Sequence, residues 1–218
     1  MSAELSATAT VEEILSKKSV IELRELARSF YVKGSSKMRK VELISEVKAA
    51  LMIPERLEEL LYVLDSAAWQ TFRKAAETSE PVQLNLTESR WYQILHGLCY
   101  LHFITGNRSL ACNVPPEIRT VYNSLVTDGL IQRKKHYDQL HLYAEAAANL
   151  YGVISQDDFV ALFNSQNEDI TSKEELFDAL IRHIVVDAGY CFWDKYIVDI
   201  GFEDNGFADV SDLLVQIG

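Results

Sequence analysis

The sequence predicts a mainly α-helical protein with two short β-hairpins. The 218 residues include only four prolines and nine glycines, which leaves long uninterrupted segments that favour helix. Several apolar-periodic segments follow a Ser or Thr that has an acidic residue three positions later, a pattern typical of a helix start. Two pairs of apolar runs are separated by short turn sequences and predict hairpins. A content of 48% hydrophobic and 24% charged residues excludes global disorder.

A small helical module is expected near the N-terminus, at residues 10–53, after a polar tail at residues 1–9. Its first helix has the capping box Thr10/Glu13, and its second, with an apolar face, has the capping box Ser19/Glu22. The module is too small for a large core, so we expect it to be marginally stable or docked on its neighbour.

A connector and a third helix complete the module. Gly34 can take a positive φ in the connector, and Ser36 is expected to cap the next helix. That helix carries one apolar stripe at positions 38, 41, 44, 47 and 51. Pro54 is expected to end or restart it.

Residues 54–135 predict a winged-helix-like domain. Its elements are, in order, two helices within 55–77 broken near Asp65-Ser66, a short strand at 81–85, a helix capped by Thr87, a hairpin about Gly106-Asn107 and a helix from Pro115-Pro116. Helix, helix and hairpin in this order are the layout of a winged-helix module. The candidate reading helix, "ESRWYQILHGLCYL", has one Arg and one Glu, and the hairpin adds Arg108. DNA reading needs more cations and amides, so we expect a scaffold here.

Residues 136–218 are expected to form a helical region with the second hairpin. After Gly129, residues 130–150 read as one long helix; the later elements are a helix capped by Ser155 with Asp158, a helix capped by Thr171 with Glu174, a hairpin at 190–200 and an amphipathic helix at 208–216. Acidic residues are frequent between 156 and 200, which favours a protein partner or a homodimer over nucleic acid. The basic triplet Arg133-Lys134-Lys135 is expected to be solvated.

Charge is distributed unevenly along the chain. The formal net charge is −11, yet residues 17–48 carry nine Lys/Arg against four Glu, which gives +5 and leaves −16 for the remainder. This asymmetry indicates an anionic partner for the N-terminal segment. No apolar run approaches the ~20 residues that a membrane span requires. The first residues do not read as a secretory signal, so we expect a cytoplasmic protein.

The stretch "YVKGSSKMRKVELI", residues 31–44, places four cations and one carboxylate around a Gly-Ser-Ser turn. Cations at a helix start oppose the helix dipole, which favours a functional reason for them. A phosphate is expected to take backbone donors from 35–37, the two serine hydroxyls and the lysine charges. The candidate nucleic-acid-binding residues are Arg24, Arg28, Lys33, Gly34, Ser35, Ser36, Lys37, Arg39 and Lys40.

Residues 19–51 resemble the N-terminal domain of the bacterial transcription termination factor Rho and the related SAP modules. The matching features are Leu23, Glu25-Leu26-Ala27, Val32, Gly34, Lys37, Arg39-Lys40 and Glu42-Leu43-Ile44. The resemblance implies a helix–extended loop–helix module that binds DNA or RNA or tethers a protein to it, in a transcription-related setting. The chain has no GxxxxGK[ST] sequence and is too short for the OB fold and ATPase of Rho. It therefore carries the module in another context.

Catalytic and metal sites are not expected. His96, Cys99 and His102 follow an i, i+3, i+6 spacing, but a fourth ligand is missing and the surrounding sequence is core-like. Three cysteines without a CxxC pair indicate neither a disulfide framework nor a zinc knuckle.

The sequence thus predicts a non-enzymatic nucleic-acid-associated protein without a cofactor. The alternatives are a protein-interaction scaffold, in which the basic turn pairs with acidic surface, a turn that is merely solvated, and, more remotely, a small hydrolase. A hydrolase would require an ordered pocket with perturbed titratable groups.

Overall fold

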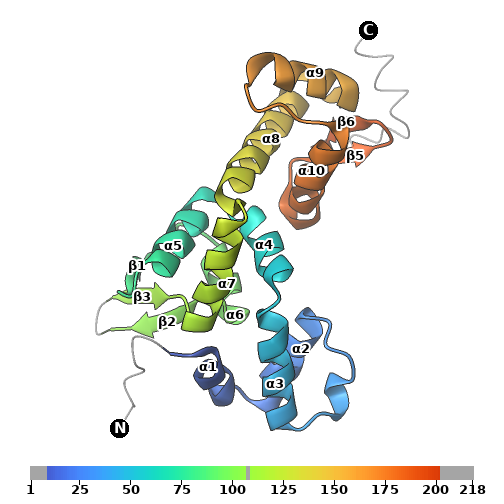
Figure 1. Ribbon diagram of the computed structural model, residues 1–218. Coiled ribbons are helices and arrows are strands. Elements are labelled where there is room, and N and C mark those ends of the chain that lie inside the picture. The colour runs from blue at the N-terminus through green and yellow to red at the C-terminus, as the bar shows by residue number, and fades with distance from the viewer. Residues whose placement is uncertain (1–8, 107–108, 202–218) are drawn as a thin grey trace. The chain divides into compact units, whose positions relative to one another are not determined.

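The computed structural model describes residues 9–106 and 109–201 (Figure 1). These residues form ten α-helices, one 3₁₀ turn and two three-stranded antiparallel sheets, which confirms the mainly α fold with short hairpins. The chain divides into two compact units, with the boundary between Leu130 and Ile131. The three domain boundaries expected from the sequence stay predictions.

The first unit begins with a helical module. Its elements are α1 (Val11–Lys17), α2 (Val20–Ser29), the 3₁₀ turn η1 (Ser35–Lys37) and α3 (Lys40–Leu51). Both expected capping boxes are present: the Glu13 amide donates to Thr10 and the Glu22 amide donates to Ser19, each at 3.2 Å. In return, the Glu13 carboxylate accepts from the Thr10 amide at 2.8 Å and the Glu22 carboxylate accepts from the Ser19 amide at 2.7 Å. Hydrogen bonds of the cap residues to the two carboxylates lower the pKa values of both glutamates.

The module packs on the rest of the first unit. The Val11 amide donates to Glu117 of α7 (Pro116–Thr127) at 3.1 Å. Phe30, at the end of α2, meets Tyr100 edge to face with ring centroids 6.1 Å apart. Arg56 of α4 (Pro54–Tyr62) donates to the Phe30 carbonyl at 2.5 Å and lies over the Phe30 ring. The small module is thus docked on its neighbour.

The third helix of the module starts later than expected. Ser36 does not cap it; residues 35–37 form η1, and α3 begins only at Lys40. Met38 and Arg39 are extended, with ψ of 143° and 165°. A residue of the first turn of α3 stabilises this start: the Glu42 carboxylate accepts a hydrogen bond from the Arg39 amide at 2.7 Å.

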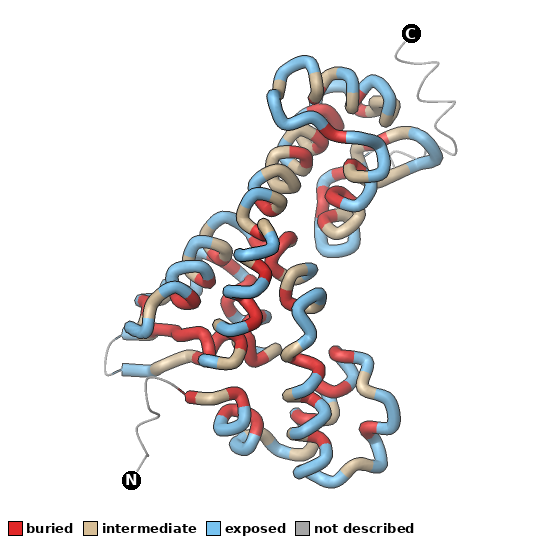
Figure 2. Tube along the Cα trace, viewed as in Figure 1, coloured by how far each residue is buried: buried red, intermediate tan, exposed pale blue. Residues whose placement is uncertain are grey.

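The remainder of the first unit packs helices on a small sheet. Its elements are α4 (Pro54–Tyr62), α5 (Ser66–Glu77), β1 (Val82–Leu84), α6 (Trp91–Gly97), β2 (His102–Thr105), β3 (Leu110–Asn113) and α7 (Pro116–Thr127). The sheet order is β1-β3-β2, so the central strand is the most buried, as Figure 2 shows. Asn107 of the expected hairpin turn lies outside the described residues.

Thr87 is not the cap of α6. Its hydroxyl donates to Asn85 instead, and the helix begins four residues later, at Trp91. The turn before α6 is held by Ser89, which donates to Asp65 at 2.6 Å and accepts from the Trp91 amide. A partner 24 residues away therefore decides where this helix begins.

The second unit has the elements α8 (Leu130–Tyr151), β4 (Val153–Ser155), α9 (Gln156–Gln166), α10 (Lys173–Asp187), β5 (Tyr190–Trp193) and β6 (Tyr196–Asp199). The sheet order is β4-β6-β5, in which β4 was not anticipated. Ser155 caps α9 as expected. The cap of α10 is Ser172 rather than Thr171, and it accepts from the Glu175 amide at 3.2 Å.

The winged-helix identification of residues 54–135 stays a prediction. The expected helix at 208–216 lies outside the described residues. Among the described helices, none combines the length and the apolar character that crossing a lipid bilayer demands.

Candidate nucleic-acid interface

The candidate interface is the connector between α2 and α3. Helix α2 ends in two backbone hydrogen bonds, from the Val32 amide to the Ala27 carbonyl at 2.7 Å and from the Tyr31 amide to the Arg28 carbonyl at 2.9 Å. This pair of bonds is the Schellman motif, which requires a left-handed residue directly after the cap. Tyr31 occupies that position with φ of 54°. The connector therefore leaves the helix through a sharp and ordered turn.

Gly34 bends the connector a second time. It adopts φ of 75°, as the sequence predicted, and a Cβ at this position would meet nothing within 4 Å. The glycine is therefore required by its backbone conformation and not by a close contact. After it, the Lys37 amide donates to the Gly34 carbonyl at 3.1 Å and closes η1.

Backbone donors are less available here than the sequence suggested. The Lys37 and Met38 amides are used within the turn, and the Arg39 amide is held by Glu42. Ser35 is buried, with 8% of its surface exposed, while Ser36 is exposed. The phosphate site expected at residues 35–37 thus has fewer donors than the sequence suggested and stays a prediction.

Four cationic side chains on the connector and its flanks are exposed and have no hydrogen-bond partner in the described part of the chain. They are Arg28, Lys33, Lys37 and Arg39, here called the basic loop. Within the described ranges, no carboxylate lies at ion-pair distance from any of them. Figure 2 shows this connector as a mostly exposed loop of the first unit.

Two further candidate cations, Lys40 and Arg24, differ from the basic loop, because one is hydrogen-bonded within the module and the other is half-buried. Lys40 donates from its Nζ to the Ser16 carbonyl at 2.8 Å and so ties α3 to α1. Arg24 is half-buried, and its Nε lies buried without a hydrogen-bond partner in the described part of the chain. Ser36 is exposed beside the basic loop.

Lys48, a further cation of the module, is paired with carboxylates. Lys48 of α3 lies 2.9 Å from Glu12 and 3.9 Å from Glu117. The hydrogen bond with Glu12 raises the pKa of Lys48. Lys48 thus helps to dock the module, whereas the cations of the basic loop make no ion pair within the described residues.

Tyr31 was not anticipated as a candidate. It has 87% of its surface exposed and lies two residues before Lys33 of the basic loop. The sequence did contain a signal: the apolar pattern of α2 ends at Phe30, and the next position carries an aromatic residue where Gly or Asn is usual.

In the group His96, Cys99 and His102, the cysteine and His102 are buried and His96 is half-buried. Burial raises the pKa of Cys99 to about 11 and lowers the pKa values of both histidines. His96 stacks on Phe103, with ring centroids 4.1 Å apart. No cluster of three or more His, Cys, Asp or Glu side chains suited to a metal ion occurs in the described residues.

The winged-helix-like region offers little for base reading. Trp91, Tyr92 and Leu95 of α6 are buried and supply the core of the first unit. Arg90 places its guanidinium over the Trp91 ring at 5.8 Å. The scaffold role of this region stays a prediction.

The basic triplet in α8 is not simply solvated. Lys134 has only 1% of its surface exposed and is hydrogen-bonded to Asp138, one helical turn later. Burial raises the pKa of Asp138, and the lysine opposes that shift. The expectation of a solvated turn was therefore wrong for Lys134, because its i,i+4 partner permits burial.

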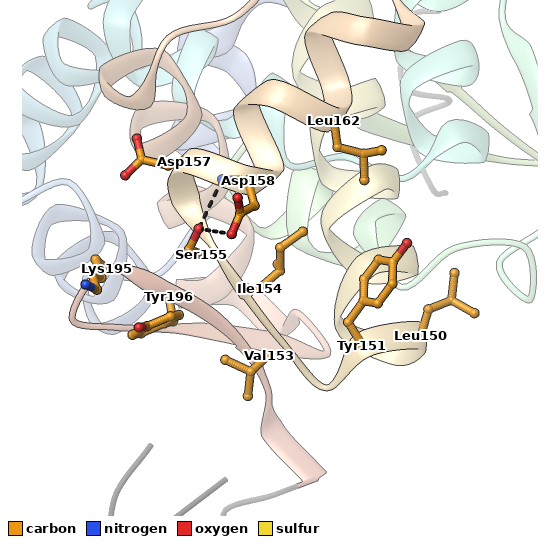
Figure 3. Close-up of a pocket in the computed structure, with 10 residues that line it drawn as sticks. All are labelled: Leu150, Tyr151, Val153, Ile154, Ser155, Asp157, Asp158, Leu162, Lys195 and Tyr196. Atoms are coloured by element: carbon orange, nitrogen blue, oxygen red, sulfur yellow. Dashed lines mark hydrogen bonds between the residues drawn. The ribbon is translucent and has the colours of Figure 1, made fainter. Parts of the chain in front are cut away.

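The second unit contains a groove of about 830 Å³ (Figure 3). Leu150, Val153, Ile154 and Leu162 contribute to its apolar lining. Its polar groups serve local structure: Ser155 and Asp158 form the cap of α9, while Asp157 pairs with Lys173 at 2.5 Å.

Comparison with known proteins supports the N-terminal module. Residues 15–55 match the family model described as the Rho termination factor, N-terminal domain. The match confirms the resemblance over residues 19–51. No curated protein and no solved structure matches the chain. The matched domain is a nucleic-acid-binding module, and the whole basic loop lies within it, consistent with nucleic-acid association.

Proposed function

We propose that this protein is a non-enzymatic nucleic-acid-associated protein that contacts DNA or RNA phosphates through Arg28, Lys33, Lys37 and Arg39. One observation carries the proposal. In a chain of net charge −11, these four exposed cations lack carboxylate partners among the described residues and lie inside the segment that matches the Rho N-terminal domain. Unpaired cations on an ordered loop suit phosphate contact.

Attraction between the loop and the phosphates supplies the affinity. About 3–5 phosphate contacts are within reach of four cations and Ser36, so binding should be weak and should fall steeply with salt. The remainder of the chain is strongly acidic and repels the nucleic-acid backbone. Repulsion elsewhere orients the protein so that the basic loop meets the strand.

The matched module suggests a tether rather than an enzyme. In this proposal the second unit recruits a protein partner or a second copy, supported by the excess of carboxylates between residues 156 and 200. A cytoplasmic, transcription-related setting is supported by the resemblance to Rho.

A charge-reversal titration tests the proposal. The wild type is titrated against fluorescent DNA and RNA oligonucleotides at about 50 and about 200 mM salt. The variant Lys33→Glu/Lys37→Glu/Arg39→Glu should lose binding at both salt concentrations. The matched control Lys74→Glu/Lys135→Glu/Lys195→Glu has the same net charge, and all three of its lysines are exposed on other elements. It should retain most of the affinity.

The scaffold alternative makes the opposite prediction. If the basic loop binds acidic protein surface only, the wild type should bind neither DNA nor RNA at the lower salt concentration. Equal losses in the two triple variants would show that net charge, and not the basic loop, governs binding.

A further inference from the structure

Tyr31 combines two unfavourable features. A positive φ is energetically unfavourable for an L-residue with a Cβ, in contrast to glycine. Bulky residues therefore rarely adopt it. Tyr31 nevertheless has φ of 54° at the left-handed position of the Schellman motif, where Gly or Asn is usual. Its side chain also has 87% of its surface exposed, more than any other large apolar side chain of the described residues.

The other non-glycine residues with positive φ have evident reasons. Cys99 follows the end of α6 in the same kind of motif, with φ of 65°, and its side chain is completely buried in the core. Asp194 lies in the turn between β5 and β6, where an Asp tolerates this conformation. Packing explains Cys99 and turn chemistry explains Asp194. Neither explanation applies to Tyr31.

The position of Tyr31 suggests what the side chain is for. Phe30 next to it is buried against Tyr100, and Arg56 holds the Phe30 carbonyl, so the backbone at this point is anchored. Arg28 and Lys33 flank Tyr31 within three residues on either side. A phenol ring is thus presented to solvent from a rigid base between two exposed cations.

We propose that Tyr31 is a stacking platform for one unpaired base of a single-stranded nucleic acid, an inference that rests on the proposed function of the basic loop. Proteins that bind single strands combine cations that follow the backbone with exposed aromatic rings on which bases stack. The bases of a duplex are already stacked on one another, so the ring discriminates in favour of the single strand. Stacking is tolerant of base identity, because every base has a π-face.

Four probes test this inference. Three of them are single strands of equal phosphate number: a 12-nucleotide oligodeoxythymidylate, a 12-nucleotide oligouridylate and an abasic 12-mer. The fourth is a duplex of six base pairs, so that its two strands together also have 12 nucleotides. The wild type should bind the thymidylate and uridylate probes about five- to tenfold more tightly than the abasic strand, the lower end of base–aromatic stacking. Tyr31→Gly should remove that preference and leave abasic and duplex binding unchanged.

Stability separates a binding role from a structural one. Glycine is the residue that the Schellman position favours, so Tyr31→Gly should keep a Tm at least equal to that of the wild type. Tyr31→Trp should retain the preference for probes with bases and should show fluorescence quenching on binding. A lower Tm together with lower affinity for all probes would overturn the stacking role.

The outcomes distinguish this inference from the proposed function. If the wild type binds the thymidylate and abasic strands equally, or if Tyr31→Gly binds thymidylate like the wild type, base stacking is excluded while phosphate contact by the basic loop stands. If the wild type binds none of the four probes at low salt, the proposed function fails and the stacking platform fails with it.

Discussion

Glu42 reaches back over the first turn of α3 and accepts a hydrogen bond of 2.7 Å from the amide of Arg39. A carboxylate thus occupies the end of the helix at which the sequence suggested a phosphate. Cations at positions 39 and 40 oppose the helix dipole, and Glu42 offsets that effect from within the same turn. Glu42 thus takes up the Arg39 amide, and the exposed cationic side chains of the basic loop are left for an external partner.

The Glu42 carboxylate should weaken nucleic-acid binding by its charge alone. Glu42→Gln removes the charge and retains an amide oxygen that can accept from Arg39, so affinity should rise about twofold at low salt, as expected for one like charge near the phosphates. Glu46→Gln, one turn further along α3 and also exposed, is the matched control. Anisotropy titrations should show the larger gain for Glu42→Gln. Equal gains would indicate a long-range charge effect.

Substitutions of Lys40 and Lys37 should differ in their effects: the first should lower mainly the stability, and the second mainly the affinity for nucleic acid. Lys40→Met breaks the hydrogen bond to the Ser16 carbonyl and should cost about 0.5–1.5 kcal/mol in the free energy of unfolding. Lys37→Met removes an exposed cation and should leave that free energy within about 0.5 kcal/mol of the wild type, while lowering affinity more than Lys40→Met. Urea unfolding and anisotropy are the two measurements. A reversed order of the two affinities would contradict the assignment of Lys37 to the basic loop.

Arg56 should matter for docking of the module. Its guanidinium donates to the Phe30 carbonyl and lies 5.7 Å from the centre of the Phe30 ring. Arg56→Ala should lower the free energy of unfolding by about 1.5–2 kcal/mol, the sum of a hydrogen bond and a cation–π contact. The surface pair Arg73–Glu77 supplies the control, because Arg73→Ala should cost only about 0.3–0.5 kcal/mol. Similar costs in the two variants would argue against a specific anchor at Phe30.

His183 should make the second unit sensitive to acid. It is buried, and its ring stacks on His141 with centroids 3.9 Å apart. Burial, followed by repulsion from His141, lowers the pKa of His183 to about 3. The unfolded chain binds a proton on this residue near pH 6.5 and the native protein does not, so the stability due to neutral His183 is lost as pH falls from about 6.5 toward 3.

His183→Phe removes this titration and keeps an aromatic ring against His141. Between pH 7.5 and 5.5 the wild type should lose about 1 kcal/mol more unfolding free energy than the variant. Urea unfolding followed by circular dichroism at the two pH values measures the difference. Parallel losses in the two proteins would mean that His183 titrates alike in the folded and unfolded states.

Local signals in the sequence predicted local structure well. The pairs Thr10/Glu13 and Ser19/Glu22 cap their helices as expected because both partners lie within one helical turn. Pro54 starts α4 because its fixed φ suits a first helical position.

The predicted element boundaries were wrong where a residue distant in the sequence forms a contact that the local pattern does not show. Ser89 bonds Asp65, 24 residues away, and α6 therefore begins after the expected Thr87. Strand β4 is only three residues long and exists because it pairs with β6, which no local pattern encodes.

The candidate site was predicted in part. The positions of the cations on a loop bent by Gly34 follow directly from the sequence. The sequence does not show which lysines are engaged by other groups. Lys40 is hydrogen-bonded to Ser16 and Lys134 to Asp138, and both contacts arise only when the chain is folded. Tyr31 was missed because its exposure and its positive φ are properties of the folded chain.

The salt dependence of binding tests the central claim most directly. The logarithm of the affinity for a single-stranded 12-mer is measured against the logarithm of the salt concentration, for the wild type and for Lys33→Met/Lys37→Met/Arg39→Met. Each lost phosphate contact should flatten the slope by about 0.7, so the variant's slope should be shallower by about 2. Two parallel lines would contradict the account, since the phosphates would then be held by other residues.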